Sequence, residues 1–351
     1  MNLEQNIYNV SVEGGELDIR FSTNIAEDEL LIYGSLGTGT WLTQETKTRA
    51  SSSYMLNLTV LPNTDGVSRT AYIYFVKVTD MESIVVEMVT IIQRGEVASE
   101  STDYSSDKKV RVLQTAKLGK GLPIVLMGDG FIDTEINDGT YDAVMDKAFE
   151  NLFTEEPIKS LRDYFNVYAV TAVSKHNIFG TGYETALGCE LAGGNSTGIS
   201  GEDNAVQRYV QCVDNIDMSE TLAVVILNSP AYAGTTYFGY TNQTKVVEFA
   251  IAYCPVIYDL QSESFRQVLV HEAVGHGFAK LEDEYAYQEN GTISSKEIKN
   301  VQYLQTLGWA QNVDFTSDPS QVLWSAFLND NRYVSEKLGV FEGACTYIKG
   351  A

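Results

Sequence analysis

The chain has 351 residues, 44% of them hydrophobic, which is enough for two domains that each bury a core. Acidic side chains outnumber basic ones by 23, and the sequence pI is near 4.4. Such a surface repels a phosphate backbone, so nucleic acid is not an expected partner. No stretch approaches the roughly 20 continuous apolar residues of a membrane span, and residues 1–5 lack the pattern of a signal peptide.

The first part of the chain predicts an all-β sandwich. Short runs of alternating polarity are separated by turn residues such as Gly14-Gly15, Pro62-Asn63 and Asp65-Gly66. The expected strands are residues 17–21, 56–61, 71–76 and 84–93. No residue in this part suggests catalysis.

Several local motifs of this part resemble the BACON domain, a small immunoglobulin-like sandwich that is often appended to enzymes of gut bacteria. The matching motifs are Val12-Glu13-Gly14-Gly15, Trp41-Leu42, Pro62-Asn63 followed by Ser68-Arg69-Thr70-Ala71, and Ile92-Gln93-Arg94-Gly95. The resemblance implies a fold and carries no active site. It also implies contact with glycan or mucin, with a plain spacer as the alternative role.

The polar segment 99–110 is expected to be a linker, because it has little apolar surface to bury. Beyond it, apolar runs alternate with helical patterns, which predicts an α/β arrangement with a sheet covered on both faces. The expected strands are residues 122–127, 165–174 and 222–228, and the expected helices span about 141–162 and 204–213.

A later helix carries two of the three histidines of the chain, in the run Val270-His271-Glu272-Ala273-Val274-Gly275-His276. Asp259 or Ser262 is the expected cap of this helix, and residues 265, 268 and 269 give it a core-facing stripe. Two histidines beside a glutamate have the composition of the His-Glu-x-x-His zinc motif.

The histidines are five residues apart, one more than in that motif. In a regular α-helix, about 100° per residue would separate them by roughly 140°, so both could not bind one ion. A local π-bulge would return them to one side, and Gly275 is the residue best suited to it. We therefore predict a bulged metal helix.

A catalytic zinc site needs a third protein ligand. Three consecutive acids follow the helix, and we expect Asp283 to be the ligand, with Glu284 and Glu282 as alternatives. Glu272 is expected to be the general base that takes a proton from the attacking water. Tyr285 is one candidate for stabilising the oxyanion. His176, the third histidine, is expected to be structural or to face substrate.

The four cysteines, Cys189, Cys212, Cys254 and Cys345, are widely spaced and form no Cys-x-x-Cys pair. They therefore suggest neither a zinc ribbon nor a dithiol redox site. Small buried side chains are the favoured interpretation, with one or two disulfides as the alternative.

From about residue 122 to its end, the chain resembles the IgA-peptidase family of zinc metallopeptidases from gut bacteria. The matching stretches are Met127-Gly128-Asp129-Gly130-Phe131, Glu155-Glu156-Pro157-Ile158, Tyr164-Phe165-Asn166-Val167, Ile226-Leu227-Asn228, Tyr232-Ala233-Gly234, residues 268–271 and residues 281–285. The resemblance implies that His271, His276 and Asp283 bind Zn²⁺ and that Glu272 is catalytic. It also implies an edge strand between residues 223 and 258 that pairs with extended substrate, with residues 231–234 at the cleft rim or in a plain turn.

The sequence thus predicts a multidomain chain: an all-β immunoglobulin-like sandwich (residues 1–98), a linker (99–110) and an α/β (α+β) zincin-like metallopeptidase domain (111–351). The expected function is zinc-dependent hydrolysis of host or dietary protein, with immunoglobulin A as one candidate substrate. The alternatives are an inactive glycan- or glycoprotein-binding protein at the cell surface and a zinc amidase acting on peptidoglycan. Relatives with BACON-type domains imply export to the cell surface, periplasm or exterior.

Overall fold

The computed structural model describes residues 1–12, 14–34, 41–50, 53–63, 69–79, 83–93, 99–180, 183–192, 198–238, 249–284, 293–336, 338–342 and 348–349. Tyr285 and Cys345 lie outside the described residues. No helix among the described residues is long and apolar enough to cross a membrane.

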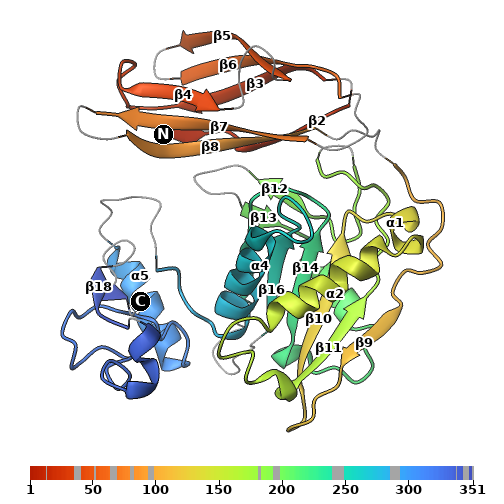
Figure 1. The fold of residues 1–351 in the computed structure, drawn as a ribbon, viewed down its shortest axis with the longest axis vertical. Helices are drawn as coiled ribbons and strands as arrows, with labels where there is room; N and C mark the ends of the chain where they lie inside the picture. The colour runs from red at the N-terminus through yellow and green to blue at the C-terminus, as the bar shows by residue number, and fades with distance from the viewer. Residues whose placement is uncertain are drawn as a thin grey trace.

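Two four-stranded sheets form the N-terminal region (Figure 1). One has the order β1-β3-β6-β5 and the other β2-β8-β7-β4. Their strands are β1 Asn2–Leu3, β2 Ile7–Val10, β3 Gly15–Ser22, β4 Leu30–Gly34, β5 Leu42–Ala50, β6 Ser53–Val60, β7 Arg69–Val78 and β8 Ser83–Gln93. Ile19 and Leu56 from the first sheet and Ile73 and Ile91 from the second share one buried core. The predicted two-sheet packing and its four expected strands are therefore present.

A six-stranded sheet of order β15-β16-β14-β10-β11-β9 forms the centre of the second region. β10 Leu122–Asp129, β11 Phe165–Val170, β14 Leu222–Leu227 and β16 Ala250–Pro255 are parallel, as expected for a sheet with crossover connections. β9 Val110–Gln114 and β15 Thr235–Phe238 are antiparallel and lie at the two edges.

Both faces of this sheet are covered, as the apolar runs predicted. α2 Thr140–Leu152, α4 Glu263–Leu269 and the π-helix η3 Val270–Phe278 pack on one face, and α3 Asp203–Val210 packs on the other. α2 is shorter than the expected helix, which extended to residue 162. Pro157 disfavours the helical conformation of the residue before it, so the pattern does not continue as one helix.

The remaining elements are short, apart from one helix. α1 Asp133–Asn137 precedes α2, and the strands β12 Glu190–Ala192 and β13 Gly198–Ser200 form a small pair. α5 Ser295–Thr306 begins a C-terminal segment with its own small core around Trp309. β17 Val313–Asp314, β18 Phe341–Glu342 and β19 Ile348–Lys349 complete this segment. The short 3₁₀ helices are η1 Arg162–Tyr164, η2 Met218–Glu220 and η4 Asn331–Glu336.

The N-terminal sheets and the second region meet near the loop between β14 and β15. Ile7 and Ile92 form a small buried cluster with Ala231 of that loop. Beside it, the rings of Tyr72 and Tyr258 pack edge to face, with centroids 6.2 Å apart. Residues 99–109 run along the second region, where the backbone N–H groups of Thr102 and Asp103 donate to the buried Asp133 carboxylate.

Cys189 and Cys254 are buried and carry free thiols, and Cys212 is partly buried and also free. The interpretation as small buried side chains is thus confirmed for Cys189 and Cys254, whereas Cys212 is only partly buried.

Candidate metal centre

The helix with the two histidines consists of α4 and a π-helical segment that follows it directly. The Ser262 hydroxyl accepts a hydrogen bond from the Phe265 N–H and caps α4, as one of the two expected caps. The next nine residues, Val270–Phe278, form η3. The predicted irregularity at His271 and His276 is confirmed, although it extends over a whole segment instead of a single bulge around Gly275.

The wider turn of η3 brings the two histidine rings together. Nε2 of His271 and Nε2 of His276 are 3.1 Å apart, and the ring planes cross at 84°. Ala273 and Val274 of the same segment are buried against the sheet, so the histidines lie on a side that faces away from the core. The His271 side chain is 38% exposed and the His276 side chain 15%.

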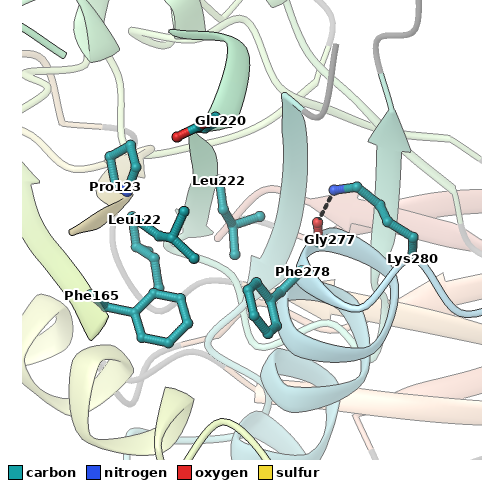
Figure 2. Close-up of a pocket in the computed structure, with 9 residues that line it drawn as sticks. Leu122, Pro123, Phe165, Glu220, Leu222, Gly277, Phe278 and Lys280 are labelled. Carbon is teal, nitrogen blue, oxygen red and sulfur yellow. Dashed lines mark hydrogen bonds between the residues drawn. The ribbon is translucent and has the colours of Figure 1, made fainter. Parts of the chain in front are cut away.

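The end of η3 is fixed beside the amino ends of the parallel strands (Figure 2). Phe278 packs edge to face on Phe165, with ring centroids 5.2 Å apart. A Cβ on Gly277 would lie 2.6 Å from Leu222 Cδ1, so the glycine leaves room for the Leu222 side chain of β14 against the helix. Lys280, at φ 56°, turns the chain out of the helix and donates from Nζ to the Gly277 carbonyl oxygen. The turn directs the acidic residues back toward the histidines.

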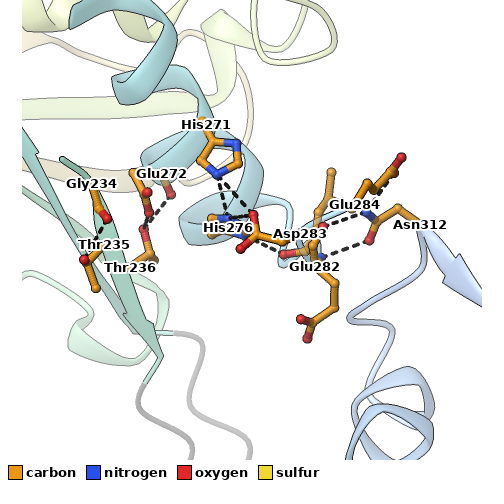
Figure 3. A network of polar contacts seen from close by, with 11 residues as sticks. Gly234, Thr235, Thr236, His271, Glu272, His276, Glu282, Asp283, Glu284 and Asn312 are labelled. Atoms are coloured by element: carbon orange, nitrogen blue, oxygen red, sulfur yellow. Dashed lines mark hydrogen bonds and ion pairs between the residues drawn. The ribbon is translucent and has the colours of Figure 1, made fainter. Parts of the chain in front are cut away.

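Asp283 is the acid that reaches the two imidazoles (Figure 3). Its Oδ1 lies 3.2 Å from His271 Nε2 and 3.1 Å from His276 Nε2. Ligand atoms placed tetrahedrally about zinc at its usual bond lengths lie roughly 3.3 Å apart, so the three observed separations suit one ion. Among the described residues, His271, His276 and Asp283 form the group of side chains able to hold a metal.

The chemistry of the donor set also fits a metal. His276 Nδ1 lies 2.6 Å from the Leu281 carbonyl oxygen, which can only accept, so Nδ1 carries the hydrogen. Such a partner fixes the tautomer that presents Nε2 to a metal. Burial lowers the pKa of His276, but the Asp283 carboxylate and the Leu281 carbonyl outweigh burial and raise that pKa to about 9. The site therefore favours positive charge at the point where the three atoms meet.

Asp283 responds to the same charges in the opposite direction. Burial raises the pKa of its carboxyl, but hydrogen bonds from His271 and His276 outweigh burial and hold the pKa well below its usual range. Asp283 is therefore ionised, as a metal ligand must be.

The two alternative acids point elsewhere. The Glu284 carboxylate accepts a hydrogen bond from the side chain of Asn312, 2.9 Å away. Burial raises the pKa of the Glu282 carboxyl, and the backbone of Glu282 also bonds Asn312. The geometry therefore favours the predicted Asp283 over both neighbours.

Glu272 is buried beside the edge strand β15, with 7% of its surface exposed. The Thr236 hydroxyl lies 2.7 Å from Glu272 Oε2 and 2.9 Å from the Glu272 carbonyl oxygen. Burial raises the pKa of the Glu272 carboxyl, and the Thr236 hydrogen bond opposes that rise. A carboxyl with a raised pKa beside a candidate metal group has the character expected of a general base.

Gly234, directly before the same strand, leaves space for the Glu272 side chain. A Cβ at this position would lie 2.6 Å from Glu272 Oε1 and 2.8 Å from its Cγ. The sequence pointed to residues 231–234 as a rim with small residues, but it gave no sign that Thr236 or Asn312 contacts the site residues. Those contacts depend on pairings across 36 and 30 positions of the chain.

His176 lies outside the metal group. Its Nδ1 accepts a hydrogen bond from the Glu184 N–H at 2.9 Å, and its ring packs against Tyr183. These contacts support the structural role that we expected over ligation.

The sequence profile described as IgA Peptidase M64 matches residues 110–349, and the profile described as BACON, a putative N-terminal binding domain, matches residues 26–94. No curated protein matches the chain.

Two solved structures are similar over parts of the chain. A Bacteroides ovatus GH5 xyloglucanase in complex with a XXXG heptasaccharide shares 15% identity over 30% of this chain and 20% of its own, with a TM-score of 0.20. The GspB Siglec domain shares 12% identity over 58% of this chain and 89% of its own, also with a TM-score of 0.20. Scores this low support no inference about fold or function.

Proposed function

With residues 110–349 matched by its profile, the chain belongs to the IgA Peptidase M64 family, and on this premise we propose that it is an exported zinc-dependent endopeptidase. Membership supports a peptidase whose substrate is a protein or peptide. One observation supports a metallopeptidase in particular. His271 Nε2, His276 Nε2 and Asp283 Oδ1 lie within 3.2 Å of one another, and Glu272 is next in sequence to His271.

In this proposal, His271, His276 and Asp283 hold Zn²⁺ and Glu272 acts on the water. Bound zinc lowers the pKa of a water molecule and polarises the scissile carbonyl. The Glu272 carboxylate takes a proton from the attacking water and passes it to the leaving nitrogen. Thr236 holds this carboxylate in place through its hydroxyl.

The edge strand β15 supplies the surface for an extended peptide. It pairs with β16 on one side, and among the described residues no strand pairs with its other side. A peptide that adds to this edge by main-chain hydrogen bonds would run beside Thr236 and Glu272. We propose this pairing as the binding mode, with residues 231–234 at the rim.

We also propose the immunoglobulin-like and zincin-like fold classes, the domain limits 1–98, 99–110 and 111–351, and contact of the N-terminal domain with glycan or mucin. Immunoglobulin A is the first substrate to test, because the family description names it. Export is supported by the BACON match, since such domains occur in extracellular or surface proteins.

Elemental analysis and cleavage assays test the proposal together. The wild-type chain and Glu272→Gln are compared on a peptide library and on immunoglobulin A, with and without a chelator. We expect about one zinc per chain in both proteins and chelator-sensitive cleavage by the wild type alone. Absence of zinc from the purified and zinc-supplemented wild type would overturn the metal site, and zinc without cleavage of any substrate would overturn the peptidase.

A further inference from the structure

Asn312, which follows α5 by six residues, binds the loop that carries Asp283. Its Oδ1 accepts a hydrogen bond from the Glu282 N–H at 3.0 Å, and its Nδ2 donates to the Glu282 carbonyl oxygen at 2.8 Å. The same Nδ2 donates to Glu284 Oε1 at 2.9 Å. The Asn312 side chain thus binds the backbone of Glu282, just before Asp283, and the carboxylate of Glu284, just after it (Figure 3).

The segment with Asn312 is itself well anchored. Trp309, Ala310 and Val313 are buried in the small core that α5 completes. The Gln305 side chain donates to the carbonyl oxygens of Ala310 and Val313, and these bonds span Asn312 on both sides. The Ala310 N–H donates to the Lys280 carbonyl oxygen at 2.8 Å, so the segment touches the loop at two points.

The Asp283 side chain itself is partly exposed, at 41%. Among the described residues, its polar contacts are with the two histidines that would share the metal. On the helix side, the Leu281 N–H bonds the Gly275 carbonyl oxygen at 3.0 Å. The position of Asp283 therefore depends on Leu281 on one side and on Asn312 on the other.

We propose that Asn312 is a positioning residue of the metal centre, which makes the C-terminal segment part of the machinery that sets zinc affinity. The inference rests on the proposed zinc site and adds a residue outside its ligands and base. A side-chain amide suits this role because it offers both a donor and an acceptor to the two backbone groups of Glu282. Aspartate at position 312 would keep the acceptor but lose both donated bonds.

The experiment measures zinc affinity of the full chain by competition with a chromophoric chelator. The variants are Asn312→Ala, Asn312→Asp and, as the matched control, Gln311→Ala. Gln311 is the neighbouring amide, and its donated hydrogen bonds among the described residues go to the Gln305 and Trp309 carbonyl oxygens within the C-terminal segment. Circular dichroism and the melting temperature of each chelated protein show whether the fold survives.

Loss of a partner that orients a ligand typically weakens metal binding 10- to 100-fold, and we expect a loss of about this size in both Asn312 variants. Gln311→Ala should stay within about twofold of the wild type. Equal zinc affinity in Asn312→Asp and Gln311→Ala would overturn the inference and leave the proposed zinc site intact. If the wild type bound no zinc, the proposed function would fail, and this inference with it.

Discussion

The histidines and the aspartate of the candidate metal group come from parts of the chain with different surroundings. His271 and His276 lie on η3, which packs on β14, β15 and β16 and shares the buried core of the second region. Asp283 lies on a partly exposed loop that hydrogen bonds to the C-terminal segment. Close packing gives the helix side one arrangement, whereas the loop side depends on a few polar contacts.

The helix and the loop therefore have different roles at the candidate metal site. Core packing holds the η3 backbone that carries the two imidazoles, and hydrogen bonds bring the loop with the third ligand to them. We therefore expect substitutions on the helix side to remove function and those on the loop side to weaken it by degrees.

His276→Ala is expected to have the largest effect. It removes the less exposed imidazole of the pair and the ring that the Leu281 carbonyl orients. Zinc affinity should fall by more than roughly 100-fold, beyond the range for a partner that only orients a ligand. Asp283→Ala, measured in the same chelator competition, should retain more affinity than His276→Ala. An equal or larger loss in Asp283→Ala would contradict the proposed division between helix and loop.

Glu272→Gln separates catalysis from metal binding. The amide keeps the shape of the side chain and can still accept from Thr236, but it cannot take a proton from water. We expect kcat to fall about 10²- to 10⁴-fold, the usual contribution of a general base, with the zinc content unchanged. Cleavage kinetics and elemental analysis check both parts. If Glu272→Gln kept the kcat of the wild type, another residue would have to be the base.

Gly234→Ala tests the contact between the edge strand and the base. The added methyl would lie 2.6 Å from Glu272 Oε1, so the carboxylate must move. A displacement near 1 Å at a catalytic group can cost about 100-fold, and we expect a 10- to 100-fold loss of kcat with zinc retained. Gly198→Ala is the control, because a Cβ there meets nothing within 4 Å. Equal activity of the two variants would argue against the contact.

Thr236→Val should have the smallest effect of the four. It keeps a β-branched side chain in β15 but removes the hydroxyl that lies 2.7 Å from Glu272 Oε2. A typical intramolecular hydrogen bond contributes about 0.5–1.5 kcal/mol, so we expect kcat to fall by up to about tenfold. Thr236→Ser should recover most of this loss. Equal kcat values for Thr236→Val and Thr236→Ser would show that the hydroxyl has no role in catalysis.

Much of the helix side could be predicted from the sequence, because its evidence is local. The spacing of His271 and His276 predicted a π-helical irregularity, and the glutamate between them is the residue that we propose as the base. The strands of both regions were also predictable from alternating or continuous apolar runs. The end of α2 was not predicted correctly. The helical pattern of the sequence continues beyond Leu152, but Pro157 restricts the backbone of the residue before it and prevents one long helix.

The loop side was less predictable, because three neighbouring acids have the same chemistry. Residue type alone could not decide between Glu282, Asp283 and Glu284. The decision depends on the turn at Lys280 and on the bonds to Asn312, which pair residues 28 and 30 positions apart. The contacts of Gly234 and Thr236 with Glu272 are likewise tertiary and have no local motif.

Anomalous diffraction at the zinc absorption edge, from crystals of the full chain grown with zinc, tests the metal centre most directly. We expect one strong peak about 2.0–2.2 Å from His271 Nε2, His276 Nε2 and a carboxylate oxygen of Asp283. A peak coordinated by other side chains, or no peak between the two histidines, would contradict the proposed site.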